Sequence, residues 1–485
     1  MRDSLPRRLG ALFLCMALDA CSSARSASVP DAGSTSGDPD AANIDPSVVT
    51  FHKDVEPIVQ KTCQPCHVSG GIAPFPLIAY ADAKAYADLI VAQTSAGTMP
   101  PWGAVGTPDC MPGYAWKDDI RLSSASIATL KAWRDQGAAE GDPSDAPPPV
   151  VRAPLALAGA QLELSPAAPY ALLDGPSDQF RCFVLDPNLT ATSYVNGTFI
   201  VPGNSTVVHH ALVFADSGAA SKALITDPAT GSYDCFGGPG FSNTTLVAAW
   251  APGSVPVEYP ADVGAELAPG SLLVMQVHYH PHSATAVLGP DQSKLQLRFA
   301  ASKPGHLATA MLLGNFDSPV TTTGLLAGTG LLPGPDDPPT GPVFDIPPGV
   351  QGHTEAMQVT VPALSPPLQI VGVGGHEHYV GSAVEITITR NNPQEAAEPP
   401  QECLLSIPKW NFDWQRFYAY DTTLDALPKA MAGDVVQIKC TYDNTLQNTQ
   451  LAASLAYRGL SQPQDVKLGE TTLDEMCLGA FLVIQ

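Results

Sequence analysis

From about residue 160 to the C-terminus, the chain is a succession of short strand-like runs, and this pattern constrains its fold most. The runs are rich in Val, Ile, Thr and Tyr and alternate between apolar and polar positions, as half-buried strands do. The clearest lie at 180–185, 193–201, 206–215, 271–280, 296–300, 368–380, 383–390 and 434–444. The chain also contains 48 prolines and 41 glycines, which favour turns over long helices. The pattern predicts one or two antiparallel β-sandwiches.

The charge balance narrows the range of partners. The 485 residues include 24 Lys and Arg against 47 Asp and Glu, which gives a formal net charge of −23. Phosphate groups would repel so acidic a chain, and no nucleic-acid partner is therefore expected. The length of the chain corresponds to roughly three domains.

The N-terminus has the pattern of an export signal. Three arginines within residues 1–8 precede an apolar run at 9–18, which is too short to span a bilayer as a helix. Residues 18–21 (LDAC) resemble a bacterial lipoprotein cleavage box, in which Cys21 would carry the lipid; the alternative is a plain secretory signal. We therefore expect an exported protein in the periplasm or outer membrane, which contacts a membrane only through its lipid anchor.

A short motif near residue 65 indicates covalent haem attachment. Residues 51–67 are helix-like and end in Cys63-Gln64-Pro65-Cys66-His67, the C-x-x-C-H pattern of c-type haem. Two thiols at this spacing can form thioethers with one macrocycle while the adjacent imidazole binds the iron. The alternative is a zinc or redox C-x-x-C motif, but a zinc site needs a second ligand pair, and none precedes Cys110.

The sixth haem ligand is expected in a proline-rich loop. Residues 97–102 (GTMPPW) resemble the Met-Pro-Pro-Trp element of small bacterial cytochrome c domains, and this resemblance implies Met99 as the distal ligand. Met111 is a weaker competitor, and Met99 could instead be a packing residue. A methionine ligand raises the haem potential and suits electron transfer. Residues 123–137 are predicted to form a closing helix that is capped by Ser123 or Ser124.

The histidines are concentrated in the strand-rich region. Of 11 in the chain, nine lie between residues 209 and 378. His376 and His378 are two apart, so on a strand both imidazoles would face one side and could hold one metal ion. His209 and His210 are adjacent, so joint ligation requires a strand end or a bulge. His278 lies on a further predicted strand. Each group alone could equally be surface histidines on an edge strand or one satisfied core histidine.

Four separated motifs together resemble one enzyme family. Residues 208–211 (VHHA), 276–279 (QVHY), 376–378 (HEH) and 474–477 (DEMC) occur in the order found in the copper type II ascorbate-dependent monooxygenases. That family includes peptidylglycine alpha-hydroxylating monooxygenase and dopamine beta-monooxygenase. The resemblance implies two jelly-roll-like β-sandwiches, each with one copper ion. It assigns an electron-transfer copper to His209, His210 and His278, and an oxygen-binding, catalytic copper to His376, His378 and Met476.

The cysteines fit an oxidising compartment. Of the ten, Cys15 belongs to the leader, and export makes disulfides the default for cysteines without other chemistry. The resemblance implies two disulfides, Cys182–Cys235 and Cys440–Cys477, the second of which would hold Met476 beside its metal. Cys110 and Cys403 are unassigned: they are either free or paired with each other.

Several positions depart from the peptide-amidating branch of the family. Gly374 occupies the position of an arginine that binds the substrate carboxylate there. Other departures are at Phe180, Leu478 and Ala480. A peptide ending in glycine is therefore not the expected substrate. His280 and His282 are additional histidines, which indicate either further copper loading or an exposed loop.

We therefore expect a multidomain oxidoreductase, with a small all-α cytochrome c domain followed by two all-β jelly-roll-like antiparallel sandwiches. The expected boundaries are a leader at 1–21, a disordered tether at 22–48, the cytochrome c-like domain at 49–142, a linker at 143–164, and sandwiches at 165–300 and 301–485. The expected function is a copper-dependent monooxygenase that hydroxylates a C–H bond with O₂. Its electrons would pass through the second copper and the fused haem c, with ascorbate as a possible reductant and a separate redox partner also possible. The expected substrate is a small molecule or is peptide-like.

Two alternatives remain open at this stage. One is a non-catalytic exported lipoprotein that carries electrons or copper. The other is a surface sandwich that binds sugar or protein, with incidental metal.

Overall fold

The computed structural model describes residues 48–69, 73–150, 155–173, 178–242, 244–280, 289–315, 327–334, 337–393 and 399–485, with no account of the side chains of 327–329. The predicted leader, Cys21, nearly all of the tether and His282 lie outside these ranges. Among the helices of the described ranges, none is both long enough and apolar enough to cross a membrane.

Most helices of the described residues lie between residues 51 and 135. A continuous helical segment consists of η1 (Phe51–Val55), α1 (Glu56–Ile58) and η2 (Val59–Cys63), and it is followed by α2 (Tyr80–Ala85), α3 (Ala87–Ser95) and α4 (Ser124–Asp135). The predicted closing helix is confirmed as α4, and the Ser123 side chain accepts a hydrogen bond from the backbone N–H of Ser126 at its start. Phe51, Leu130 and Trp133 lie in a small apolar core of their own. A short turn, η3 (Pro143–Asp145), follows.

The first β-sandwich consists of residues 162–299. Its strands are β1 (Leu162–Leu164), β2 (Gln179–Leu185), β3 (Ser193–Val201), β4 (Val208–Asp216), β5 (Ser232–Asp234), β6 (Thr245–Trp250), β7 (Val257–Glu258), β8 (Val263–Leu267), β9 (Leu272–Tyr279) and β10 (Lys294–Phe299), with η4 (Ala220–Leu224) between β4 and β5. One layer has the strand order β5-β2-β9-β4-β6, and the other contains β1-β10-β3-β8. Apolar side chains from both layers, such as Phe183, Val213 and Leu295, share one core. Because β1 pairs with β10, the sandwich begins inside the range predicted as linker.

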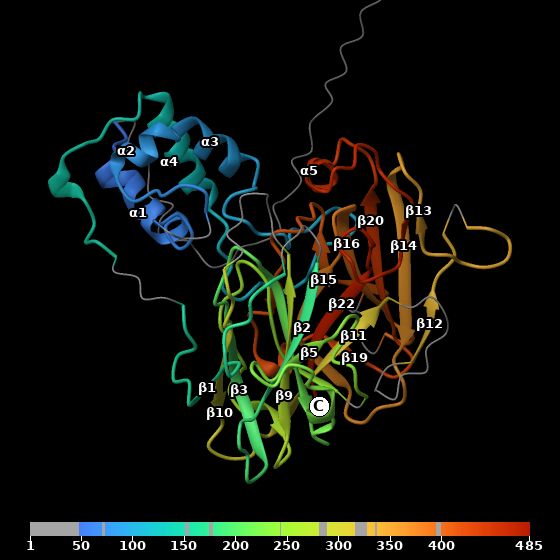
Figure 1. Cartoon of the computed structure of the whole chain (residues 1–485). Coiled ribbons are helices and arrows are strands. Elements are labelled where there is room, and N and C mark those ends of the chain that lie inside the picture. The colour runs from blue at the N-terminus through green and yellow to red at the C-terminus, as the bar shows by residue number, and fades with distance from the viewer. Residues whose placement is uncertain are drawn as a thin grey trace, which may run out of the picture. The chain divides into compact units, whose positions relative to one another are not determined.

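The second β-sandwich consists of residues 306–484. Its elements are β11 (His306–Gly314), β12 (Ala327–Leu331), β13 (Asp345–Ile346), β14 (Gln351–Thr360), β15 (Leu368–His376), β16 (Gly381–Thr389), β17 (Gln401–Ile407), β18 (Phe417–Ala419), η5 (Leu424–Ala426), β19 (Lys429–Ala430), β20 (Val435–Asp443), α5 (Thr449–Tyr457), β21 (Val466–Lys467) and β22 (Leu478–Ile484). One layer has the order β12-β14-β20-β16-β17, and the other contains β11-β22-β15-β18. Figure 1 shows β14, β16 and β20 of the first of these layers in orange and red. Val373, Ile386 and Ile438 belong to the core between the layers.

One sheet runs through both sandwiches. The parallel pairing of β8 with β11, at His306 opposite Val263, joins β1-β10-β3-β8 to β11-β22-β15-β18 in a ten-stranded sheet. The two sandwiches therefore share this sheet. Each of them has its own five-stranded layer facing it. All eight strand-like runs singled out in the sequence contain a strand of the structure, and the antiparallel sandwiches are confirmed.

A segment from the predicted haem domain packs against the second sandwich. Trp102, Ala104 and Trp116 belong to the core of that sandwich and not to the helical core. Pro112 forms an isolated bridge with Cys403. Residues 99–121, called the 99–121 segment below, therefore extend along the second sandwich.

Candidate metal centre

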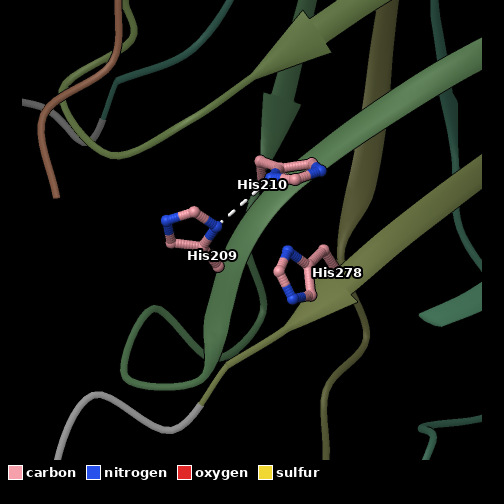
Figure 2. Close-up of side chains that lie close together, drawn as sticks. All are labelled: His209, His210 and His278. Atoms are coloured by element: carbon pink, nitrogen blue, oxygen red, sulfur yellow. Dashed lines mark hydrogen bonds between the residues drawn. The ribbon is translucent and has the colours of Figure 1, made fainter. Parts of the chain in front are cut away.

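Three histidines meet on adjacent strands of the first sandwich. His209 and His210 lie on β4, and His278 lies opposite His210 on β9. The register of the two strands shifts between Val208 and His210, which is the bulge that joint ligation by neighbouring residues requires. One nitrogen from each ring lies within 4.8 Å of the others, and Figure 2 shows the three rings side by side. The predicted grouping of these three histidines is thus present.

The ring nitrogens of this group suit a metal ion. His209 Nδ1 and His210 Nδ1 are 3.2 Å apart, an interaction that the dashed line in Figure 2 marks. His278 Nε2 bonds to the Asp178 carboxylate at 3.2 Å, whereas His278 Nδ1 is buried with no hydrogen-bond partner among the described residues. A buried nitrogen without a partner is costly unless a ligand uses its lone pair. A metal ion bound by the three rings would satisfy it.

Burial keeps the imidazoles of His210 and His278 neutral. Desolvation lowers the pKa of His210 far below its ordinary value, and the neighbouring histidines lower it further. Burial also lowers the pKa of His278, although the Asp178 carboxylate acts in the opposite direction. A neutral imidazole has a lone pair available for a metal, so both side chains are ready to ligate at neutral pH.

The second histidine group lies at the end of β15. The sequence predicted both histidines on one strand, but β15 ends at His376, and His378 lies in the turn that leads to β16. The prediction of strand placement is therefore wrong for His378, because the chain turns toward Gly381 immediately after the strand. The two rings still lie close together, with centroids 5.1 Å apart.

Each ring of the second group is oriented through its Nδ1 atom. His376 Nδ1 bonds to Gln415 Oε1 at 2.7 Å, and His378 Nδ1 bonds to the backbone oxygen of Asp474 at 3.0 Å. A hydrogen bond of this kind at one ring nitrogen fixes the tautomer and leaves Nε2 to bind metal. Burial lowers the pKa of His376 to about 4 and that of His378 to about 3, so both rings are neutral.

The Glu475 side chain holds the backbone of both Met476 and His378. The buried Glu475 carboxylate accepts hydrogen bonds from the backbone N–H groups of His378 and Met476. Burial raises the pKa of Glu475 to about 8. The Tyr442 hydroxyl donates to the Met476 carbonyl at 2.9 Å. Met476 itself is only 7% exposed. The backbone of Met476 is therefore fixed relative to His378 through one shared carboxylate.

The two histidine groups face each other. The ring centroids of His210 and His376 are 5.9 Å apart, although the residues belong to different sandwiches. The Phe412 ring of the second sandwich stacks on His209 of the first, with centroids 4.2 Å apart. Phe412 is fully buried, so this contact removes water from the space beside the first group.

Asp178 links the two sandwiches through its carboxylate. One carboxylate oxygen bonds to His278 Nε2 at 3.2 Å and to His280 Nδ1 at 2.7 Å. The other oxygen accepts hydrogen bonds from Thr472 Oγ1 at 2.8 Å and from Arg458 at 3.3 Å, both in the second sandwich. Burial acts to raise the pKa of Asp178, but its interactions with His278 and His280 outweigh that effect and hold the pKa well below its ordinary value. Asp178 is therefore an ionised link between the sandwiches.

His280 does not lie in an exposed loop. It is 2% exposed, and its Nε2 bonds to the Tyr379 hydroxyl at 2.9 Å while its Nδ1 bonds to Asp178. The exposed-loop interpretation is thus wrong for His280, because both ring nitrogens are used in buried hydrogen bonds. With Asp178 and His278 it forms a second cluster of potential metal-binding groups.

The structure describes all three chemical residues of the C-x-x-C-H motif. Cys63 and Cys66 are half-buried and form no disulfide, and His67 Nδ1 bonds to the Phe75 carbonyl oxygen at 2.9 Å. This hydrogen bond leaves Nε2 of His67 for an axial position. Burial raises the pKa of the Cys63 thiol, which is the reverse of what a reactive C-x-x-C redox motif needs. Met99 is 42% exposed, and its competitor Met111 is 62% exposed.

The six described cysteines outside the C-x-x-C-H motif form three disulfides. Cys182–Cys235 and Cys440–Cys477 agree with the pairing implied by the family resemblance. Cys110 pairs with Cys403, the pairing that the sequence left open. This last bond joins the 99–121 segment to β17 of the second sandwich.

Sequence reasoning missed the residues that orient the ligands. The important ones are Asp178, Phe412, Gln415 and Glu475. Glu475 lies within residues 474–477 (DEMC), but the family resemblance assigns a role there only to Met476 and Cys477. Asp178 lies 100 residues from His278 in sequence, and Gln415 lies 39 residues from His376. Side chains of these types are common, so no local pattern distinguishes them.

Comparisons with known proteins add no family. A scan against protein-family models and a search of curated proteins found no match. A chain of the cowpea mosaic virus top component, naturally occurring empty particles, is similar over 67% of this chain and 88% of that chain, at 9% identity and a TM-score of 0.24. For allantoicase the coverage is 54% and 77%, at 9% identity and a TM-score of 0.14. For the infectious bursal disease virus VP2 subviral particle it is 65% and 81%, at 10% identity and a TM-score of 0.17. At these TM-scores the similarities support no relationship in fold or function.

Proposed function

We propose that this chain is a copper-dependent monooxygenase that uses O₂ to hydroxylate a C–H bond of a small organic substrate. The observation that carries the proposal is the meeting of the two imidazole groups at the half-buried residues His210 and His376, with ring centroids 5.9 Å apart. Their sequence motifs resemble those of the copper type II ascorbate-dependent monooxygenases in order and composition.

The donor atoms favour copper over other metals. Imidazole nitrogens bind copper well, and a thioether such as that of Met476 favours Cu(I). Copper, when bound, supplies the one-electron chemistry that lets O₂ react with a C–H bond. His209, His210 and His278 would hold one ion, and His376, His378 and Met476 would hold the other. The two groups differ in composition, which suits two different roles better than storage of one metal.

The protein's own residues prepare these ligands. Gln415 orients the His376 ring, and Asp178 orients the His278 ring. Glu475 holds the backbone beside both His378 and Met476. Phe412 covers His209. The site thus has preoriented neutral ligands in a largely dry interface, and this arrangement lowers the cost of reorganisation during reaction.

We further propose that the N-terminal part is a cytochrome c module with Cys63, Cys66, His67 and Met99 as its haem-binding residues. Two neighbouring cysteines outside the disulfides and a preoriented His67 support this assignment. An export signal and a lipidated Cys21 would place the enzyme in the periplasm or on the outer membrane. There, ascorbate or a redox partner could reduce the cytochrome c module.

The substrate is proposed to lack a terminal glycine carboxylate. Gly374 lies on β15 opposite Phe417 and has no side chain with which to bind an anion. Phe180 stacks on the His278 ring, with centroids 4.2 Å apart and planes 11° apart. An aromatic ring in this position covers the ligand and presents an apolar surface.

Metal and haem analysis together with oxygen uptake test the proposal. The full chain should contain one iron as covalent haem and two copper ions, and it should consume O₂ in the presence of a reductant and hydroxylatable small molecules. His378→Ala should lose one copper ion and the oxygen uptake but retain the haem. A wild-type chain that binds both coppers yet hydroxylates nothing across a broad substrate panel would contradict the proposed function.

A further inference from the structure

The 99–121 segment is fastened to the part of the second sandwich that carries His376. The backbone N–H of Gly103 donates to the Tyr418 hydroxyl at 3.0 Å, and the Trp102 ring packs edge-on against Tyr418, with centroids 5.1 Å apart. The Arg416 guanidinium lies 4.7 Å from the centre of the Trp102 ring. The Cys110–Cys403 disulfide adds a covalent tie. The segment that begins with Met99 is therefore firmly held against residues 403–420.

A continuous connection leads from Met99 to His376. Met99 is joined through Pro100 to Pro101, whose carbonyl oxygen accepts a hydrogen bond from Trp414 Nε1 at 3.1 Å. Trp414 is followed directly by Gln415, whose Oε1 atom bonds to His376 Nδ1 at 2.7 Å. Two hydrogen bonds, together with the covalent chain through residues 99–101 and residues 414–415, thus connect a proposed haem ligand to a proposed copper ligand.

The first sandwich approaches the Trp414 indole closely. A Cβ atom at Gly253 would lie 2.4 Å from the Trp414 ring, so this approach is made through a glycine that has φ +85°. Trp414 therefore contacts the first sandwich as well as Pro101 of the 99–121 segment.

We propose that Trp414 and Gln415 form the electron route from the haem to the copper at His376, His378 and Met476, so that haem electrons enter at the oxygen-binding site. This inference rests on the proposed function. In each transfer the haem iron is oxidised from Fe(II) to Fe(III), and copper is reduced from Cu(II) to Cu(I). A one-electron donor of the ascorbate class reduces the haem again. The His209, His210 and His278 group is then not the entry point for haem electrons.

The test follows the haem and the copper separately from turnover. The full chain, loaded with haem and Cu(II), is mixed without O₂ with less than one equivalent of reductant. Reoxidation of the haem is followed by its absorbance, and loss of Cu(II) by electron paramagnetic resonance. In the wild type, the two signals should change together. Trp414→Phe keeps an aromatic ring but removes the N–H donor, and it should slow this transfer severalfold while haem and copper contents stay unchanged.

A matched control separates the route from packing. Trp116→Phe changes another tryptophan of the same interface, which stacks on Tyr420 with centroids 5.1 Å apart but lies off the route. It should transfer electrons at the wild-type rate. Gln415→Leu, with the rate corrected for bound copper, gives a second reading of the route if Trp414→Phe folds poorly.

Two ligand variants identify the entry point. His210→Ala should retain the transfer, whereas His378→Ala should lose it. The inference is overturned if Trp414→Phe transfers as fast as Trp116→Phe, or if His210→Ala abolishes the transfer. Copper-dependent oxygen uptake with ascorbate, measured on the same preparations, tells this failure from a failure of the proposed function: if uptake persists, only the electron route is wrong.

Discussion

His210 and His376 belong to different sandwiches, but their ring centroids are only 5.9 Å apart. The planes of the two rings are nearly perpendicular. The contact brings the two proposed copper-binding groups to one interface between the sandwiches. The β8–β11 pairing supports this closeness, because it makes one sheet common to both sandwiches. Two copper ions bound at such a short range would change each other's magnetic resonance spectra, and this effect can be measured.

We predict that the two Cu(II) ions influence each other's magnetic resonance spectra. With both sites loaded, the Cu(II) signal should be broadened or should integrate to less than two spins per chain. His378→Ala, which leaves the group of His209, His210 and His278 intact, should give a single sharp signal of one spin. Two independent, unbroadened signals in the wild type would show that the groups lie apart in solution.

Met476 tests the assignment of the oxygen-binding site. Met476→Ala should abolish hydroxylation while leaving haem reduction unchanged, because only the thioether of this site is removed. The substitution also leaves a cavity, which costs about 2–5 kcal/mol of stability for a buried methionine. Met476→Leu therefore serves as the matched variant, since a swap that conserves volume costs less than about 1.5 kcal/mol. Both variants should lose activity, and Met476→Leu should unfold close to the wild-type temperature. Full activity in Met476→Leu would exclude the thioether as a ligand.

The sequence predicted the building blocks of this structure better than their assembly. The strand-like runs and the closing helix depend on local patterns of a few residues, and both are present in the structure. Joint ligation by His209 and His210 required either a strand end or a bulge, and the structure has a bulge there. The end of β15 at His376 is not a local matter. It depends on the turn into β16, where the buried Glu475 carboxylate accepts the backbone N–H groups of His378 and Gly381.

The candidate site shows the same division. The ligand types were evident from their motifs, but their orientation depends on partners that are distant in sequence. Gln415 orients His376. Asp178 contacts both His278 and Arg458, and Arg458 lies 280 residues from Asp178 in the sequence. The contact of Asp178 with Arg458 and that of His210 with His376 form only where the two sandwiches meet, so the closeness of the two histidine groups could not be derived from spacing.

Asp178 should support both metal binding and the interface. In Asp178→Asn the side chain keeps its shape but loses its charge, so His278 loses its anionic partner. Loss of such a partner typically weakens metal binding about 10–100-fold. Copper titration should therefore show a weaker site at His209, His210 and His278 and an unchanged site at His376. Arg458, whose side chain is 16% exposed, also loses a counter-charge, so the free energy of unfolding should fall by about 3–5 kcal/mol.

An exposed carboxylate provides the control for Asp178→Asn. Asp234 pairs with Arg181 at 2.6 Å, but its side chain is 87% exposed. Asp234→Asn should change stability by less than about 1 kcal/mol, because solvent screens exposed ion pairs. It should leave copper binding unchanged. Equal effects of the two substitutions would mean that Asp178 has no special role.

The Cys110–Cys403 disulfide should hold the 99–121 segment on the second sandwich. The bond joins cysteines 293 residues apart in sequence, and its neighbours Trp102 and Trp116 lie in the same core. Replacing both cysteines with serine should lower the free energy of unfolding by about 2–5 kcal/mol, as for other native disulfides. It should also make the segment a site of limited proteolysis, which mass spectrometry can locate. The matched variant is the double serine replacement of Cys182 and Cys235, which should lose stability without new cleavage in the 99–121 segment. Cleavage there in both variants would mean that general loss of stability, and not the local tie, exposes the segment.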